Sequence, residues 1–165
     1  MTAPQRITPC LWFNSNADAA VAHYCAIFKE ARIESITRYG PSQPGPEGAV
    51  MTILFSIEGQ SFLALNGGPQ FPFTPAISLI VHCDDQAEID EYWERLSAGG
   101  AKGRCGWLTD KFGVSWQIVP RALPDFLTGG NPEQANRVMK AVLAMDKLDI
   151  AAVRRAAGAN RLDAP

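Results

Sequence analysis

The chain has 165 residues, of which 47% are hydrophobic and 19% charged, so it can bury a sizeable core and general disorder is excluded. Its formal net charge of -2 argues against a nucleic-acid partner, because phosphate binding requires a concentrated basic patch. No stretch approaches the roughly 20 apolar residues that cross a bilayer, so no membrane partner is expected either.

The chain start and the cysteines together predict a cytoplasmic protein. Residues 1–5 lack the basic stretch and apolar run that begin an export signal. Cys10, Cys25, Cys83 and Cys105 have no CxxC spacing, which argues against structural zinc and favours reduced thiols. We therefore expect a reducing compartment.

The first third of the chain predicts one β-α-β-β-β module. An apolar strand over 7–14 leads into turn and cap residues at 14–16, followed by a helix over 17–28. The loop at 40–48 contains three prolines and three glycines, which exclude regular structure there. The helix has one apolar stripe, made of Ala20, Val21, Tyr24, Ile27 and Phe28. Three further strands are predicted at 31–39, 49–57 and 61–66.

The same order of elements repeats after a Gly- and Pro-rich bridge at 67–75. A helix over 86–98 begins after the capping residues Asp84 and Asp85, and its stripe is Ile89, Tyr92, Trp93 and Leu96. The strands of this second module are predicted at 76–83, around 102–107 with an extended piece near Leu108, and at 115–119. The fold class predicted is α+β, with two tandem β-α-β-β-β modules that form curled mixed sheets.

The remainder of the chain predicts C-terminal helices. One helix opens at Asn131-Pro132 and another spans 149–157. The first has an apolar face made of Val138, Ala141, Val142 and Met145. The predicted organisation is a first module at 1–67, a second module at 76–120 and a helical tail at 121–165, within one compact domain overall.

Four separated motifs carry a resemblance to a known family. They are Leu11-Trp12-Phe13-Asn14, Leu63-Ala64-Leu65-Asn66-Gly67-Gly68-Pro69, Cys105-Gly106-Trp107-Leu108 and the stretch from Asp110 to Pro120. Together they resemble the PhnB-like branch of the vicinal-oxygen-chelate superfamily, the glyoxalase, bleomycin-resistance and dihydroxybiphenyl-dioxygenase fold. That branch carries the label 3-demethylubiquinone-9 3-methyltransferase domain. The resemblance implies that the modules form a glyoxalase-like cup around a ligand and that the protein is a homodimer.

The resemblance also indicates where a metal would bind. In metal-dependent relatives, four strands each offer one inward ligand, usually His or Glu. The matching positions here are Thr8 or Cys10, Phe62 or Ala64, Ser78, and Gln117. Only Gln117 has an oxygen ligand of the right length, and a neutral amide binds divalent ions weakly. We therefore predict neither a metal nor another cofactor.

Strand alternation predicts which side chains face the cup. If Leu11 and Phe13 pack on the helix, then Cys10, Trp12 and Asn14 point the other way. The same argument selects Met51 or its neighbours, Ala64, Asn66, Ser78, Ile80, His82, Ser115 and Gln117. The ligand-binding residues predicted are Cys10, Trp12, Met51, Asn66, Ser78, His82 and Gln117. This lining suits a small hydrophobic or aromatic molecule stacked on Trp12.

Two other functions stay open at this point. The protein could be an enzyme, such as a lyase, a dioxygenase or the methyltransferase of the label, that uses a metal elsewhere or Cys10, His82 or Gln117, although no catalytic residue is identified. The label is the less favoured reading, because Gly67-Gly68-Pro69 leads into a strand and not into the helix that a dinucleotide-type fold requires. The protein could instead be a dimeric structural protein whose cup is filled by its own side chains. The sequence leaves open the ligand's identity and whether the modules pair within a chain or across the dimer.

Overall fold

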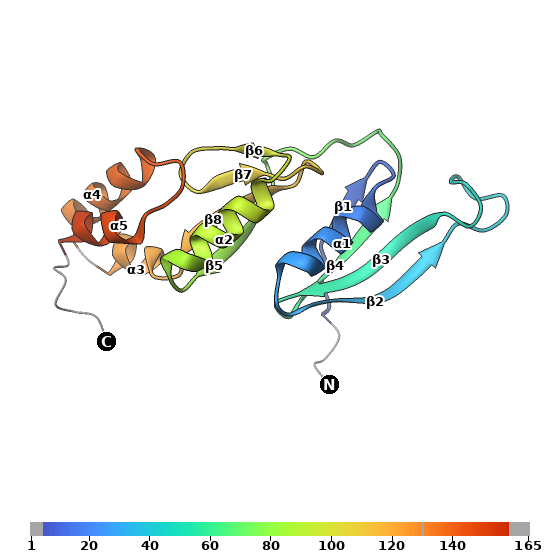
Figure 1. Cartoon of the computed structure of the whole chain (residues 1–165), viewed down its shortest axis with the longest axis horizontal. Coiled ribbons are helices and arrows are strands. Elements are labelled where there is room, and N and C mark those ends of the chain that lie inside the picture. The colour runs from blue at the N-terminus through green and yellow to red at the C-terminus, as the bar shows by residue number, and fades with distance from the viewer. Residues whose placement is uncertain (1–4, 130, 159–165) are drawn as a thin grey trace. The chain divides into compact units, whose positions relative to one another are not determined.

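A computed structural model describes residues 5–129 and 131–158 of the chain. Its internal contacts divide the chain into two compact units, residues 1–73 and 74–165. Each unit has one helix packed on one face of a four-stranded sheet (Figure 1).

The first unit is a β-α-β-β-β module. Its elements are β1 (Cys10–Phe13), α1 (Ala17–Ile27), β2 (Ala31–Arg38), β3 (Val50–Ile57) and β4 (Gln60–Asn66). The sheet order is β1-β4-β3-β2, with β1 parallel to β4 and the other neighbours antiparallel.

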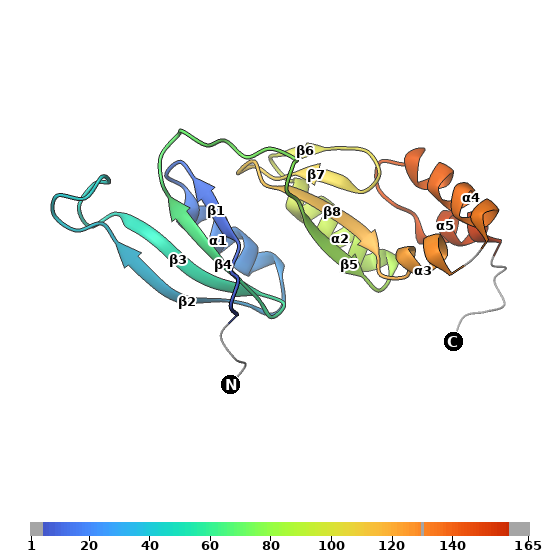
Figure 2. The ribbon, with the colours of Figure 1, turned by 180° about the vertical axis from the view of Figure 1, so that it is seen from behind.

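The core of the first unit lies between α1 and the sheet. All five residues of the predicted helix stripe are buried. The ring of Tyr24 stacks on Phe55 at 6.4 Å between centroids, and Phe55 stacks on Phe62 at 5.5 Å. Full burial of a side chain such as Phe55 contributes roughly 2 kcal/mol. Among residues 5–73, no helix covers the opposite face of this sheet (Figure 2).

The second unit repeats this order and then adds three helices. Its elements are β5 (Leu79–Cys83), α2 (Gln86–Ser97), β6 (Ala101–Lys102), β7 (Trp107–Thr109), β8 (Ser115–Pro120), α3 (Leu123–Thr128), α4 (Pro132–Leu143) and α5 (Ile150–Ala157). The sheet order β5-β8-β7-β6 matches that of the first unit, again with one parallel pair, β5 and β8. The predicted stripe of α2 is buried throughout.

The strand predicted around 102–107 is interrupted by a turn. Cys105 and Gly106 both adopt left-handed backbone conformations, with φ of 59° and 81°, which break the extended chain between β6 and β7. Their N–H groups donate to the carbonyl oxygens of Met145 and Asp146 at 2.8 and 2.7 Å. The tail therefore fixes this turn.

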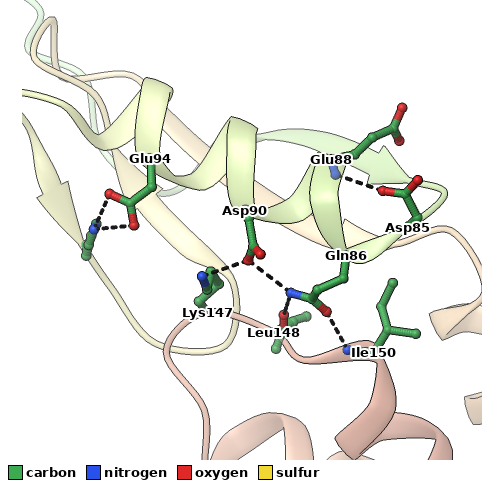
Figure 3. Close-up of polar contacts among 9 residues, drawn as sticks. Asp85, Gln86, Glu88, Asp90, Glu94, Lys147, Leu148 and Ile150 are labelled. Atoms are coloured by element: carbon green, nitrogen blue, oxygen red, sulfur yellow. Dashed lines mark hydrogen bonds and ion pairs between the residues drawn. The ribbon is translucent and has the colours of Figure 1, made fainter.

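The helical tail is packed on the β-α-β-β-β part of the second unit. Its apolar side chains form a core cluster with the end of β8, made of Val119, Val138, Val142, Leu148, Val153 and Ala157. The Gln86 amide of α2 donates to the Leu148 carbonyl at 3.1 Å and accepts from the Ile150 N–H at 2.9 Å. Nearby, Lys147 pairs with Asp90 at 2.7 Å (Figure 3).

The predicted α+β fold of two tandem β-α-β-β-β modules with C-terminal helices is confirmed. The two sheets are mixed and neither closes on itself. Every helix within the described residues is too short or too polar to cross a bilayer.

Candidate ligand-binding site

A pocket of about 540 Å³ lies in the first unit, where β1 and β4 end and α1 begins. Four segments of the chain line it. The first segment is Asn14, Ser15 and Asp18, before and at the start of α1, and the second is Tyr39 with residues 44–46 of the loop after β2. The third is residues 49–50 at the start of β3, and the fourth is residues 66–70 at and after the end of β4. All the lining therefore comes from one unit.

The side chain of Asn66 ties three of these segments together. Its Oδ1 accepts from the Ala17 N–H at 2.9 Å, which caps the start of α1, and its Nδ2 donates to the Val50 carbonyl at 3.0 Å. The carbonyl oxygen of Asn66 accepts from the Tyr39 hydroxyl at 2.5 Å. These bonds hold the end of β4 against both α1 and the β2–β3 hairpin, so the pocket has a fixed floor.

The wall after β4 is a glycine segment held against Trp12. Gly67 and Gly68 donate their N–H groups to the carbonyls of Phe13 and Asn14 at 2.9 and 3.1 Å, and the Trp12 indole N–H donates to the Gly68 carbonyl at 2.9 Å. A Cβ on Gly67 would lie 2.3 Å from the Trp12 ring. Only glycine therefore allows this close approach.

The opposite wall is the loop between β2 and β3. Tyr39 donates its N–H to the Ala49 carbonyl at 2.9 Å, and its own carbonyl accepts from the Gly48 N–H at 2.8 Å. Gly45 packs on the Tyr39 ring, where a Cβ would approach to 2.3 Å. The loop is thus closed at its base and held along the aromatic ring.

The four residues predicted in this unit lie in four different places. Asn66 lines the pocket, and Trp12 stands behind the pocket wall, half-buried, with its ring edge-on to Phe71 at 5.0 Å. Cys10 is exposed on the face of the sheet away from α1, and Met51 is half-buried on β3; neither is a lining residue.

The side of the sheet expected for Asn66, Ala64 and Met51 differs from the observed one. Trp12 pairs with Leu65, so the leucines of β4 share its face, whereas Ala64 pairs with Leu11 on the helix-covered face. Asn66 and Met51 follow Ala64 by strand alternation. The physical reason is that small Ala64 fits beneath α1 and Asn66 caps that helix.

The other three predicted residues belong to the second unit. The Gln117 amide donates to the Ser78 hydroxyl at 2.9 Å. Ile80 pairs with Gln117, which places His82 on the same side of this sheet as Ser78 and Gln117, and His82 is exposed. They remain predicted ligand contacts, and none of them is a lining residue of the pocket in the first unit.

Several lining residues were not predicted from the sequence, among them Ser15, Asp18 and Tyr39. The signal that could have found them is the Pro- and Gly-rich loop, because an irregular loop that follows an aromatic residue is a common wall of a binding site.

The chemistry of the donor set does not fit a catalytic divalent ion. In residues 5–129 and 131–158, no three His, Cys, Asp or Glu side chains are grouped as metal ligands. Of the candidate positions, Ser78 and Gln117 are bonded to each other and are neutral, and such groups hold divalent ions weakly. Although Cys10 is exposed, desolvation by the surrounding protein raises the pKa of its thiol, which disfavours the reactive thiolate form at neutral pH.

Comparison with known proteins gives one family. The family model of 3-demethylubiquinone-9 3-methyltransferase matches residues 5–119. A solved structure of a putative 3-demethylubiquinone-9 3-methyltransferase, PhnB protein, from Bacillus cereus is 38% identical, with a TM-score of 0.65, over 70% of this chain and 99% of that chain. A protein from Pseudomonas aeruginosa is 22% identical, with a TM-score of 0.58, over 69% and 96% of the two chains, and shows the shared fold. No curated protein matches the chain.

The family match includes the whole pocket and ends before the tail. All lining residues lie between 14 and 70, inside the matched range, whereas α3, α4 and α5 begin after residue 119. The repeated module, the sheet order and the match together identify the chain as a member of the 3-demethylubiquinone-9 3-methyltransferase family, to which the PhnB protein belongs.

Proposed function

We propose that this protein binds a small, largely apolar organic molecule, without a metal, in the pocket of its first unit. The observation that carries the proposal is the pocket itself, because about 540 Å³ lies within the roughly 300–1,000 Å³ typical of small-molecule sites. Its walls combine apolar surface from Tyr39, Pro44 and Pro46 with polar side chains such as Ser15 and Gln70. Such a lining orients a ligand and excludes water from part of it.

The network around Asn66 supports binding to a prepared site. Its bonds to Ala17, Val50 and Tyr39 join α1, β3 and the hairpin before any ligand arrives. A site that is already ordered loses less conformational entropy on binding. Asn66 thus acts in this proposal as the residue that shapes the pocket, with Trp12 supporting the glycine wall.

The methyltransferase activity named in the family label is not part of the proposal. The common S-adenosylmethionine fold places a glycine-rich turn between a parallel strand and the N-terminus of a helix. Here Gly67 and Gly68 follow β4, and the chain continues as turns and extended segments up to β5. The residues present therefore do not fit that cofactor in the usual way.

The proposal is tested by a ligand screen on the full chain. Purified protein is mixed with a panel of small aromatic and aliphatic compounds, and unfolding temperatures are measured. A compound at 100 times its Kd stabilises by about 2.7 kcal/mol, which for a chain of this size raises the unfolding temperature by roughly 5–10 °C.

The pocket is then distinguished from other surfaces by a filling substitution. Ser15 is exposed and lines the pocket, so Ser15→Phe is expected to occupy the space and to abolish the shift produced by each hit. Ala22→Phe adds a similar ring on the exposed side of α1, outside the pocket, and serves as the control. No stabilisation by any compound, or equal stabilisation of the two variants, would rule out the proposed site.

We further propose that the protein is a cytoplasmic homodimer. Met139 and Leu143 are 40% and 54% exposed on one side of α4, and large exposed apolar side chains favour an association surface. All four cysteines are free thiols, as expected in a reducing compartment. Sedimentation equilibrium tests the dimer, and a monomer at micromolar concentration would refute it.

A further inference from the structure

The hydrogen-bonding groups of the pocket are unevenly divided between donors and acceptors. Pro44, Pro46 and Pro69 have no N–H to offer. The N–H groups of Tyr39, Ala49, Gly67 and Gly68 are already bonded to backbone carbonyls. The Tyr39 hydroxyl donates to Asn66, and the Asn66 amide donates to Val50. Much of the lining is therefore unable to donate a hydrogen bond to a ligand.

The charge of the pocket has one sign. Among the described residues that line it, Asp18 is the only one with an ionised side chain at neutral pH, and no lysine or arginine is a lining residue. Asp18 lies in the first turn of α1 and is exposed. Its carboxylate oxygens only accept hydrogen bonds, so they favour a ligand group that donates.

The start of α1 contributes a partial positive charge that is smaller than the negative charge of Asp18. A helix N-terminus carries a partial positive charge of roughly half an elementary charge. Asp18 brings a full negative charge to the same turn, and the Ala17 N–H is already bonded to Asn66. Among the lining groups, Asp18 therefore disfavours an anion and favours a cation.

We infer that the pocket prefers small organic cations, in which a protonated amine lies beside Asp18 and the apolar part lies against Tyr39 and the prolines of the 44–46 loop. This inference rests on the proposed function and specifies the chemical class of its ligand. The ammonium group pairs with the Asp18 carboxylate and donates hydrogen bonds that the prolines and the already bonded N–H groups of the lining cannot supply. Since Asp18 is exposed, water screens its charge, and the preference is expected to be about three- to five-fold in Kd.

The test uses three probes of matched shape and different charge. The ¹⁵N-labelled full chain is titrated at pH 7 and low salt with 2-naphthylmethylamine, 2-naphthylmethanol and 2-naphthoate, and amide chemical shifts are followed by NMR. The amine and the alcohol should both perturb residues 14–18, 39–50 and 66–70. The amine should bind about three- to five-fold more tightly than the alcohol, and this ratio should fall in 0.5 M NaCl.

Two variants locate the charge that produces the preference. Asp18→Asn should equalise the Kd values of amine and alcohol. Asp125→Asn removes the same charge from the first turn of α3, in the other unit, and should leave the ratio unchanged. The spectrum of each variant reports its folding, and the salt dependence of the original protein tests the inference without any substitution.

The outcomes separate this inference from the proposed function. Equal binding of all three probes at the pocket, or tighter binding of the naphthoate, would overturn the cation preference and leave the pocket as a ligand site. A preference that survives Asp18→Asn would also overturn it. Failure of every probe to perturb the pocket residues at millimolar concentration would remove the proposed function and this inference with it.

Discussion

The β2–β3 hairpin of the first unit and its counterpart in the second, β6 and β7, show how one module has been modified in two ways. β2 and β3 have eight residues each and carry the loop that forms one wall of the pocket. β6 and β7 have two and three residues, and the turn between them is bonded to the tail instead. Both modules keep the same sheet order.

This difference indicates a division of labour between the units. The first unit extends its sheet and gains a pocket, whereas the second unit shortens the equivalent strands and gains the cluster that contains Leu148 and Val153. The shared sheet topology is therefore compatible both with a long pocket-forming hairpin and with an added helical tail. The pocket and the tail cluster are formed largely by the segments in which the two units differ, and the repeated core supports them.

The largest effect that can sharpen this comparison is expected from Leu148→Ala. Leu148 is 1% exposed, belongs to the tail cluster, and lies against Gly106. Truncation removes its buried surface and leaves a cavity, so we expect the free energy of unfolding of the second unit to fall by about 3 kcal/mol. Hydrogen exchange measured by mass spectrometry reports protection separately for each unit.

The control for this substitution is Ile77→Ala, a similar truncation in the same unit at a residue that is 78% exposed, with an expected effect within about 0.5 kcal/mol. In Leu148→Ala, peptides from residues 79–120 should lose protection and peptides from 10–66 should keep it. An equal loss in both units would mean that the tail stabilises the whole chain and that the contrast drawn here is wrong.

The helices of both units were predictable from the sequence, because apolar spacing determines which face is buried. The apolar stripes of both helices are buried as expected, for example Tyr24 in α1 and Trp93 in α2. The ends of the elements were less accurate. The strand expected around 102–107 is broken because Cys105 and Gly106 bond to the tail, a contact over some 40 residues that no local pattern indicates.

The candidate site was predicted only in part, for a reason that the register explains. Leu63 and Leu65 have the character of core residues, yet they lie half-buried on the face away from α1, and Ala64 lies beneath the helix. When both sets of alternating side chains in a strand are apolar, the sequence does not say which set faces the helix. A shift of one residue moves each side chain to the other face of the sheet. Trp12 was assigned to the correct face because Leu11 and Phe13 flank it on a strand with clear alternation.

A second, smaller effect concerns the turns before the last strands. In the first unit, Glu58 and Gly59 turn between β3 and β4 with positive φ values of 48° and 81°. In the second unit, the buried Asp110 accepts from the N–H groups of Phe112 and Val114 and from the Trp116 indole at 2.8 to 3.0 Å. One turn therefore depends on backbone conformation and the other on a buried side chain.

Asp110→Ala is expected to lower the free energy of unfolding by about 2 kcal/mol, because buried donors lose their acceptor. Gly59→Ala should cost about 1 kcal/mol, since alanine is strained at this φ although nothing lies within 4 Å of the added Cβ. Urea unfolding of both variants gives the two values. If Gly59→Ala lowered the free energy of unfolding more than Asp110→Ala, the buried Asp110 side chain would not be the stronger of the two turn-stabilising features.

The smallest effect is expected at the ion pair between α2 and the tail, which Figure 3 shows beside Gln86. Hydrogen bonds from Lys147, and then from Gln86, hold the pKa of Asp90 below its usual value. A carboxyl group whose pKa is lowered in the folded state stabilises the protein at pH values above its ordinary pKa of about 3.9. This stability is lost as the pH falls through the pKa of the group in the folded protein. Lys147→Met should therefore reduce stability at pH 7 and have a vanishing effect in acid below about pH 3.

The size of this effect follows from exposure, since the Lys147 and Asp90 side chains are 38% and 48% exposed. Water screens such a pair, so the loss at pH 7 should be below about 0.5 kcal/mol. The Gln86 bonds to Leu148 and Ile150 remain in this variant and should keep the tail in place. Urea unfolding of both proteins between pH 2.5 and 7 measures the difference. A loss above 2 kcal/mol, or one that persists at pH 2.5, would show that Lys147 anchors the tail through its packing, and the charge would then be incidental.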